Sequence, residues 1–274
     1  MPTARLLTLA VLLIAASAPA ARAEAEDEAL APTPFNYVLG SAVSWRPDGL
    51  GSRHYAAKPA LLWAIRWGRW RISAGGANAL FGFGPESTGS GASTDLISSK
   101  LWRVGLSLRF DHGRKSADAA TTVGLPDIQR TVRGRLFARY VLSPDWHLAG
   151  SLSQDLLGHR GGLLAGLDLG WRLRHSEATE WTAGAGIGAA DGQHMRSYFG
   201  VPQEAAASNG LAAFTPSAGL RDVHVGIGFT HTLSPRWVTF GSAGVSRLLG
   251  PASQSPLTQS PTGGQVGLGL AYRN

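Results

Sequence analysis

The sequence predicts an all-β protein, a closed antiparallel transmembrane β-barrel of about twelve strands, with ten as the alternative count. Three observations predict this fold class. The chain begins with the pattern of a bacterial export signal, it contains no cysteine, and segments that alternate apolar with small or polar residues run from about residue 36 to the last residues. Short periplasmic turns and longer extracellular loops are expected between the strands.

The first 23 residues form the predicted signal peptide. Arg5 gives a positive start, residues 6–16 form a short apolar core, and Ala21-Arg22-Ala23 supplies the small residues of a peptidase site. Cleavage is expected after Ala23. The apolar run is too short to span a membrane comfortably and no charged stop-transfer flank follows it, which disfavours an uncleaved anchor.

The rest of the chain divides into a predicted acidic tail over residues 24–35 and a single barrel over residues 36–274. The tail is expected to be disordered because acidic residues and prolines dominate it. No later stretch approaches the roughly 18 consecutive apolar residues of a membrane helix, so strands would have to cross the membrane. Without cysteine, an exported chain must be stabilised by core burial or by barrel closure.

The strand signal is clearest in residues 101–110. Large apolar side chains occupy one parity from Trp102 to Phe110, and the opposite parity is small or cationic. Comparable alternation predicts eleven strands: 36–45, 60–67, 70–76, 101–110, 133–142, 145–153, 162–173, 181–190, 221–233, 236–248 and 263–273.

Glycine and the aromatic residues favour a membrane barrel over a soluble β-sandwich, which is the weaker alternative. Glycine weakens a water-facing strand but is tolerated in a crowded barrel interior. The face opposite the apolar one carries Gly184, Gly186, Gly188, Gly226, Gly228, Gly267 and Gly269. Aromatic residues mark segment ends, where interfacial girdles are expected: Trp45, Trp67, Trp70, Trp146, Trp181, Trp237 and Tyr272.

The lengths of the connections predict the orientation of the barrel. Short joints at 68–69, 143–144, 174–180 and 234–235 are expected in the periplasm, and long connections at 46–59, 191–220 and 249–262 are expected outside. Eleven strands cannot place both termini in the periplasm. Tracing from both ends gives two consecutive strands that run toward the periplasm, 101–110 and 133–142. Either one further upward strand lies in 77–100 or 111–132, or one of the early segments is misassigned.

Arginines alternate with the predicted outward residues and supply candidates for the lumen. The formal net charge is +7, but the arginines do not cluster with stacking aromatic residues, so nucleic acid is not an expected partner. The candidate lumen-lining residues are Arg66, Arg103, Arg109, Arg135, Arg139, Asp168 and Arg172. They are compatible with an anion-preferring, porin-like channel for small solutes. We favour a packed, hydrogen-bonded plug, since about twelve strands leave little free lumen once arginines fill it.

No catalytic, cofactor-binding or metal-binding residue is predicted, and the protein is not expected to be an enzyme. The short motifs of serine hydrolases, zinc peptidases and dinucleotide-binding folds are absent from the sequence. Ser153, Asp155 and His159 lie near one strand end, a proximity that arises by chance in a serine-rich chain. His194 with Asp191 is better explained by a polar outer loop than by a metal pair.

Several different short motifs follow one another along the predicted barrel. They include Gly124-Leu125-Pro126-Asp127, the stretch 154–162, Tyr198-Phe199-Gly200-Val201, Gly219-Leu220-Arg221-Asp222, Ser246-Arg247-Leu248-Leu249-Gly250 and Ser255-Pro256. In these motifs and their spacing the chain resembles the MipA/OmpV family of outer-membrane proteins over about residues 36–273. It departs from that family by ending on Asn274 instead of an aromatic residue, which bears on barrel insertion. It also carries residues 251–254 where the family has aspartates, so no cation-binding role is carried over to that loop.

The resemblance implies a scaffold at the outer membrane of a Gram-negative bacterium, linked to peptidoglycan (murein) maintenance. The family's namesake is described as bringing a murein-degrading lytic transglycosylase together with a peptidoglycan synthase. The expected partners are therefore a periplasmic murein hydrolase and synthase, besides outer-membrane lipid and lipopolysaccharide, and no cofactor is implied. The porin-like channel is the alternative function and a surface-exposed adhesin is the third.

Overall fold

The computed structural model describes residues 35–74, 90–118 and 122–274. Within them the chain forms twelve strands: β1 (Phe35–Pro47), β2 (Tyr55–Trp67), β3 (Trp70–Ala74), β4 (Gly91–Ser98), β5 (Trp102–Asp111), β6 (Thr131–Val141), β7 (Trp146–Asp155), β8 (Leu163–Arg174), β9 (Thr179–Ala190), β10 (Gly219–Thr232), β11 (Trp237–Leu248) and β12 (Thr262–Arg273). The predicted signal peptide, its cleavage site and the tail up to residue 34 lie outside the described residues.

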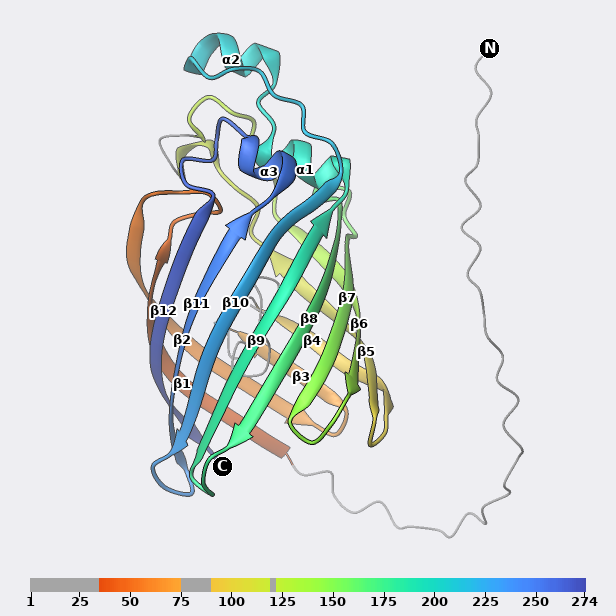
Figure 1. The fold of residues 1–274 in the computed structure, drawn as a ribbon, viewed down its shortest axis with the longest axis vertical. Helices are drawn as coiled ribbons and strands as arrows, with labels where there is room; N and C mark the ends of the chain where they lie inside the picture. The colour runs from red at the N-terminus through yellow and green to blue at the C-terminus, as the bar shows by residue number, and fades with distance from the viewer. Residues whose placement is uncertain (1–34, 75–89, 119–121) are drawn as a thin grey trace, which may run out of the picture. The chain divides into compact units, whose positions relative to one another are not determined.

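The strands form one closed antiparallel barrel (Figure 1). Each strand pairs with its neighbours in the sequence, and β1 closes the sheet by pairing with β12, so that Val38 lies opposite Arg273 and Trp45 opposite Val266. Closure lets a barrel satisfy its backbone hydrogen bonds between strands, as a membrane requires. The prediction of an all-β closed barrel of about twelve strands is confirmed.

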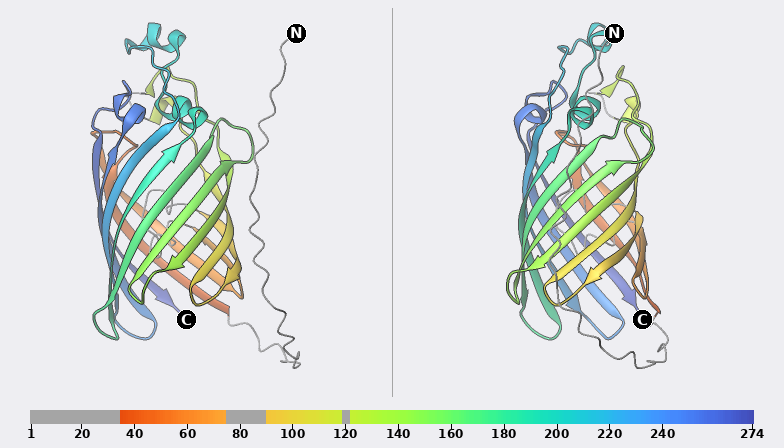
Figure 2. Two further views of the ribbon diagram at one scale, coloured as in Figure 1. Left: turned by 45° about the vertical axis from the view of Figure 1, so that its right-hand side comes forward. Right: turned by 90° about the vertical axis from the view of Figure 1, so that its right-hand side faces the viewer.

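The two ends of the barrel differ in the length of their connections. At the end that we call the turn end, strands are joined by residues 68–69, 99–101, 142–145, 175–178 and 233–236. At the opposite end, the loop end, the connections include residues 48–54, 112–130, 156–162, 191–218 and 249–261. The strands are inclined to the barrel axis, and β12 ends at the turn end (Figure 2). The predicted separation of short turns from long loops is therefore present.

The additional strand predicted between residues 77 and 132 is β4, but the predicted strand directions were wrong in this region. β4 runs toward the turn end, and β5, which was expected to run toward the turn end, runs away from it. The forward trace lacked β4, and an omitted strand reverses every direction after it. The sequence pattern did not predict β4, because its first four residues are small and a bulge between Asp95 and Ile97 breaks its alternation.

The first loop is shorter than predicted. β2 begins at Tyr55 instead of residue 60, so the predicted connection 46–59 shrinks to residues 48–54. Pro59, the last residue of the predicted connection, pairs opposite Val43 in a part of β2 that has β1 as its only partner among the described residues. A proline is tolerated there because its missing N–H need not face a second strand.

Large apolar side chains cover the outside of the barrel. Leu61 is 80% exposed, Leu268 60% and Val225 58%. Soluble monomers rarely expose continuous apolar surface on this scale, whereas the wall of a membrane barrel has to face lipid. Exposed tryptophans flank the short connections of the turn end: Trp67, Trp70, Trp102, Trp146 and Trp237. The exterior is thus the wall of a membrane-spanning barrel with an aromatic rim.

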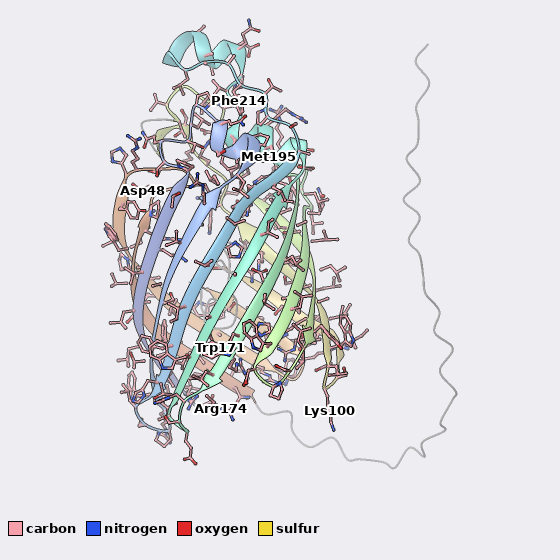
Figure 3. All side chains as sticks on the ribbon, viewed as in Figure 1. Asp48, Lys100, Trp171, Arg174, Met195 and Phe214 are labelled. Carbon is pink, nitrogen blue, oxygen red and sulfur yellow. The ribbon has the colours of Figure 1, made fainter. Side chains whose placement is uncertain are left out.

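Every helix in the described residues lies in a loop-end connection: η3 (Ser116–Asp118), α1 (Gly192–Phe199), α2 (Gln203–Asn209) and α3 (Gly250–Gln254). α1 begins where Asp191 Oδ1 accepts a hydrogen bond from the backbone N–H of His194 at 2.7 Å. Met195, Phe199 and Ala252 are buried where α1 and α3 pack over β8, β10 and β11. Figure 3 shows Met195 at this end, and Lys100 and Arg174 at the turn end. None of the helices in the described residues has the length and hydropathy needed to span a membrane.

Candidate functional site

The pairing of the strands shows which polar side chains share the inside of the barrel. Arg135 pairs with Ser153 and Arg139 with Ala149, on the parity opposite to the exposed Leu136. The same face continues through β8 and β9, and the equivalent parity of β2 and β5 carries the remaining candidates. All seven sequence-predicted lumen residues therefore occupy the inner face: Arg66, Arg103, Arg109, Arg135, Arg139, Asp168 and Arg172.

In the strands that the structure describes, arginines lie directly opposite one another at three cross-strand positions. The pairs are Arg66 with Arg71, Arg103 with Arg139, and Arg109 with Arg133. Like charges in this arrangement destabilise a sheet unless opposite charges balance them. The positions of the interior carboxylates therefore decide which arginines are compensated.

Two carboxylates compensate part of the charge near the turn end. Asp95 lies between two strands, with Oδ1 2.5 Å from Arg71 Nη2 and Oδ2 3.4 Å from Arg103 Nε. Glu180 Oε1 lies 3.2 Å from Arg172 Nε. Arg139 has no such ion pair among the described residues, and its pairing position faces Arg103. Four guanidinium groups thus share two carboxylates in this part of the lumen, which we call the cationic floor: Arg71, Arg103, Arg139 and Arg172.

A chain of buried and half-buried polar groups runs along the wall from β8 to β10. The Nε2 atom of His224 lies 2.8 Å from Asp168 Oδ1, and its Nδ1 atom lies 3.1 Å from Asp222 Oδ1. Arg221 Nε donates to Asp222 Oδ2 at 2.7 Å, and both residues are almost fully buried. A bulge between Leu220 and Asp222 shifts the register here. Asp168 is therefore engaged by a histidine and not by the arginines with which it was predicted to share the lumen.

Glycines on the inner face make room for these side chains. A Cβ atom on Gly186 would lie 2.3 Å from Asp168 Oδ1 and 2.5 Å from His224 Nε2. A Cβ on Gly170 would lie 2.3 Å from His147 Nε2, and one on Gly188 would lie 2.7 Å from an oxygen of Asp222. The polar side chains lie flat across neighbouring strands, and only glycine leaves the space for them.

A cavity of about 410 Å³ occupies the lumen. Its lining extends from residues 48–52, in the connection of β1 to β2, to Arg139, His147 and Arg172 at the cationic floor. Small residues form much of its wall on β10, β11 and β12, including Gly226, Gly244 and Gly264. The free space therefore lies beside the glycine-rich strands and reaches the arginines at its lower end.

Arg133 is the centre of a second polar cluster, at the loop end. Arg133 is 4% exposed, and its guanidinium donates to the carbonyl oxygens of Gly161 and Gly162, each at 3.0 Å. Asp155, which pairs opposite Arg133, accepts a hydrogen bond from the Gly161 N–H at 2.8 Å and another from the hydroxyl of Thr131. These contacts hold the connection 156–162 against the mouth of the barrel.

Tyr198 joins helix α1 to the same cluster. Its hydroxyl lies 3.1 Å from Asp111 Oδ2, and its ring stacks on that of His194 with centroids 4.4 Å apart. Asp111 Oδ2 also lies 3.4 Å from Arg133 Nη1. Burial, and then the neighbouring Asp111 carboxylate, raise the pKa of the Tyr198 hydroxyl above its ordinary value. The hydroxyl therefore stays protonated and donates to the carboxylate.

The motifs noted in the sequence gather at the loop end, where they build its cover. Ser255 Oγ donates to the carbonyl oxygen of Phe199 at 2.6 Å, and the N–H of Leu249 donates to the carbonyl oxygen of Arg221 at 2.8 Å. Gly250 has a φ of 48°, which favours glycine at the start of α3. The cover contains the motif positions Tyr198, Phe199, Gly200, Gly219, Leu220, Asp222, Arg247, Leu248, Leu249, Gly250, Ser255 and Pro256.

The turn end repeats one hydrogen-bonded turn four times. In each, a serine Oγ accepts a hydrogen bond from the backbone N–H three residues later: Ser99 from Trp102 at 2.9 Å, Ser143 from Trp146 at 3.2 Å, Ser176 from Thr179 at 3.0 Å and Ser234 from Trp237 at 3.2 Å. The serine N–H also donates to the carbonyl oxygen of that third residue in every case. The turns are therefore rigid and present their two central residues outward.

Sequence reasoning missed Arg71, Asp95, Arg133, His147 and His224. Four of them share the inward parity of predicted strands, so that parity could have identified them as interior residues. Asp95 lies in β4, for which no strand was assigned, and its contacts with β3 and β5 follow only from the register.

The weaker sequence alternatives do not assemble into sites. Ser153 Oγ accepts a hydrogen bond from Arg133 Nε at 3.3 Å, and His159 Nδ1 lies 2.6 Å from the carbonyl oxygen of Arg130, so both are engaged away from one another. Asp191 caps α1, and His194 Nδ1 lies 2.9 Å from the carbonyl oxygen of Gly161. In the part of the chain that the structure describes, no three potential metal ligands lie together.

Comparison with known proteins assigns the chain to a family. No curated protein is significantly similar in sequence. Among solved structures, the chain is similar to the KdgM porin (8% identity, 86% of this chain and 98% of that one, TM-score 0.42) and to OmpT of Vibrio cholerae (9%, 88% and 97%, 0.41). It is also similar to the NanC porin (7%, 85% and 98%, 0.44). The profile of the family described as MltA-interacting protein MipA matches residues 39–274. The chain belongs to the family described as MltA-interacting protein MipA.

Proposed function

We propose that this outer-membrane barrel is a scaffold that holds murein enzymes beside the peptidoglycan. The observation that carries the proposal is the rim of four Ser-closed turns, which gives the turn end a fixed shape. In exported barrels the short turns face the periplasm, where murein hydrolases and synthases work. The family description, MltA-interacting protein, names a protein partner and agrees with a docking role.

The charges on the rim suggest how a partner could be oriented. Arg69 and Lys100 are exposed on neighbouring turns, and Asp145 and Glu177 are exposed on the next two. Adjacent basic and acidic patches fix the orientation of a partner more than they add affinity. Fixed turns also reduce the entropy lost on binding.

Capture from a periplasmic extract tests the scaffold. The full chain is inserted into lipid nanodiscs and retained proteins are assayed for murein hydrolase and synthase activities. We expect wild type to retain both, and the double charge reversal Arg69→Glu with Lys100→Glu to lose at least one of them. Arg53→Glu with Arg130→Glu, two exposed loop-end residues, is the matched control and should retain both. Retention of neither activity by folded wild type, or equal retention by both double variants, would count against the proposal.

A porin-like channel is the second candidate, favoured by the cavity that extends from residues 48–52 to the cationic floor. Arginines at its lower end would favour anions. Discrete, anion-selective conductance steps of the refolded protein in a planar bilayer would support this function, and Arg103→Glu with Arg139→Glu should shift the selectivity. Absence of conductance by folded, inserted protein would rule out the channel function.

Four further features belong to the proposal. They are removal of residues 1–23 during export, contact of the apolar wall with lipid and lipopolysaccharide, a location in a Gram-negative outer membrane and a non-enzymatic role. The adhesin alternative has only the length of the connection 191–218 in its favour.

A further inference from the structure

We propose that the cationic floor of the lumen binds a phosphate group between Arg139 and Arg172, beside His147. This inference deepens the channel candidate by naming a class of solute, and it rests on the same cavity. It does not require conduction, and it is independent of the scaffold.

The topology brings the three side chains to one place. Arg139, His147 and Arg172 belong to β6, β7 and β8, which are successive strands of the wall. Arg139 pairs with Ala149, two residues from His147, and His147 pairs with Gly170, two residues from Arg172. All three line the lumen cavity, together with Thr182, which pairs opposite Arg172. The site is thus open to the cavity.

The local charge leaves an anion to be supplied. Glu180 is close to Arg172, and Asp95 is shared by Arg71 and Arg103. Asp168, the next interior acid, is bound to His224. Among the described residues no ion pair is made by Arg139, whose Nε atom is inaccessible to solvent and has no hydrogen-bond partner. A partly buried guanidinium directly opposite Arg103 is unfavourable unless an anion approaches it.

The donor set selects an oxyanion. A guanidinium presents two parallel N–H groups that match two oxygens of a phosphate or carboxylate, whereas chloride accepts them without this geometry. Two arginines on alternate strands can contact different oxygens of one phosphate, and the Thr182 hydroxyl and the His147 ring add further hydrogen-bonding groups. A volume of about 410 Å³ admits a phosphate ester as well as the free ion. A phosphate with more than two acceptor oxygens uses this arrangement better than a monocarboxylate does.

Calorimetric titration of the refolded full chain tests the site. The protein is held in detergent micelles in a chloride buffer and titrated with inorganic phosphate, and then with glycerol 3-phosphate, to separate a site for the free ion from one for esters. We expect saturable binding of one or both, weakened at least tenfold in Arg139→Gln and in Arg172→Gln. Arg247→Gln removes the same charge from an exposed position and should bind as wild type does.

Arg139→Lys keeps the charge and secures the test if the glutamine variants fail to fold. It should remain folded, as judged by heat-modifiable gel migration. It should bind phosphate more weakly, because a single ammonium replaces the two parallel N–H groups of the guanidinium. Absence of saturable phosphate binding by folded wild type, or equal binding by Arg139→Lys and Arg247→Gln, would overturn the site. Binding without conductance would remove the channel and leave the site standing.

Discussion

His224 on β10 bonds Asp168 on β8 at 2.8 Å, although β9 lies between the two strands. The contact is made over Gly186 of β9, which has no side chain to separate them. The other ring nitrogen of His224 faces Asp222, and Asp222 accepts a hydrogen bond from Arg221. One imidazole therefore links β8 to β10 across β9 on the inside of the wall, below the loop-end cover.

Replacement of His224 by alanine should destabilise the barrel by about 2–3 kcal/mol. The variant leaves the carboxylates of Asp168 and Asp222 facing each other with little solvent, and buried charged groups that lose a partner cost this much. Urea unfolding of the refolded protein, followed by tryptophan fluorescence, measures the loss. His231→Ala removes a histidine that makes one hydrogen bond with Thr179 on the outer parity, and it should cost about 1 kcal/mol or less. Equal losses of unfolding free energy in the two variants would show that the contacts of His224 with Asp168 and Asp222 stabilise the barrel no more than one exterior hydrogen bond does.

Gly186→Ala should destabilise the barrel by about 1–3 kcal/mol, because the added methyl group overlaps the His224–Asp168 contact. Gly267→Ala is the matched control, since its Cβ would make only ordinary contacts, the nearest at 3.6 Å from Ser44. The unfolding free energies of the two variants are compared with that of wild type. If the two alanine variants lose equal unfolding free energy, the space that the inner glycines leave for polar side chains does not contribute to stability.

Alternation predicted the faces of most strands because each side chain's direction is a local property of a strand. Arg139 and Arg172 were assigned to the interior on this basis, and the pairing places them there. β4 was not assigned because Leu96 and Ile97 are both exposed across its bulge, which removes the two-residue period. Asp168 was grouped with the arginines, since nothing local in the sequence indicates that a residue 56 positions later would reach it. Contacts across a barrel depend on register, which a single sequence does not contain.

The loop-end cover was visible in the sequence only through the family motifs. Met195 and Phe199 are buried by packing of α1 against α3 and β8, and eight residues of helix between strands leave little periodicity to read. Arg133 shows the same limit, because its partners Gly161 and Gly162 come from a connection.

Tyr198→Phe should remove a pH-dependent contribution to stability. Because the pKa of Tyr198 is raised in the folded protein, the folded state keeps a proton that the unfolded state releases above pH of about 10. The unfolding free energy of wild type should therefore fall as the pH rises past that value, and the fall should be smaller in Tyr198→Phe. The difference between the two proteins in absorbance at 295 nm reports the ionisation of Tyr198 itself, and its midpoint should lie above pH of about 10.

The same variant should cost about 1 kcal/mol at neutral pH through the lost bond to Asp111. Tyr140→Phe is the control, because it removes a tyrosine hydroxyl far from Asp111. The Tyr140 ring lies near the turn end, 4.6 Å from the ring of Trp102. A wild-type difference spectrum that titrates at or below the ordinary tyrosine value would contradict the assigned environment of Tyr198.

Asn274→Ala should weaken the seam between the first and last strands. The side chain of Asn274 accepts a hydrogen bond from the N–H of Tyr37 at 2.7 Å and donates one to the carbonyl oxygen of Phe35 at 3.0 Å. Closing the barrel joins the segments that are farthest apart in the sequence, so a clasp at this position stabilises the costliest pairing. A loss of about 1 kcal/mol is expected, because both bonds are exposed to solvent. Heat-modifiable gel migration of the refolded variant should show a lower unfolding temperature, whereas Gln193→Ala, an exposed change on α1, should leave it unaltered. An unchanged temperature in Asn274→Ala would mean that the backbone ladder alone holds the seam.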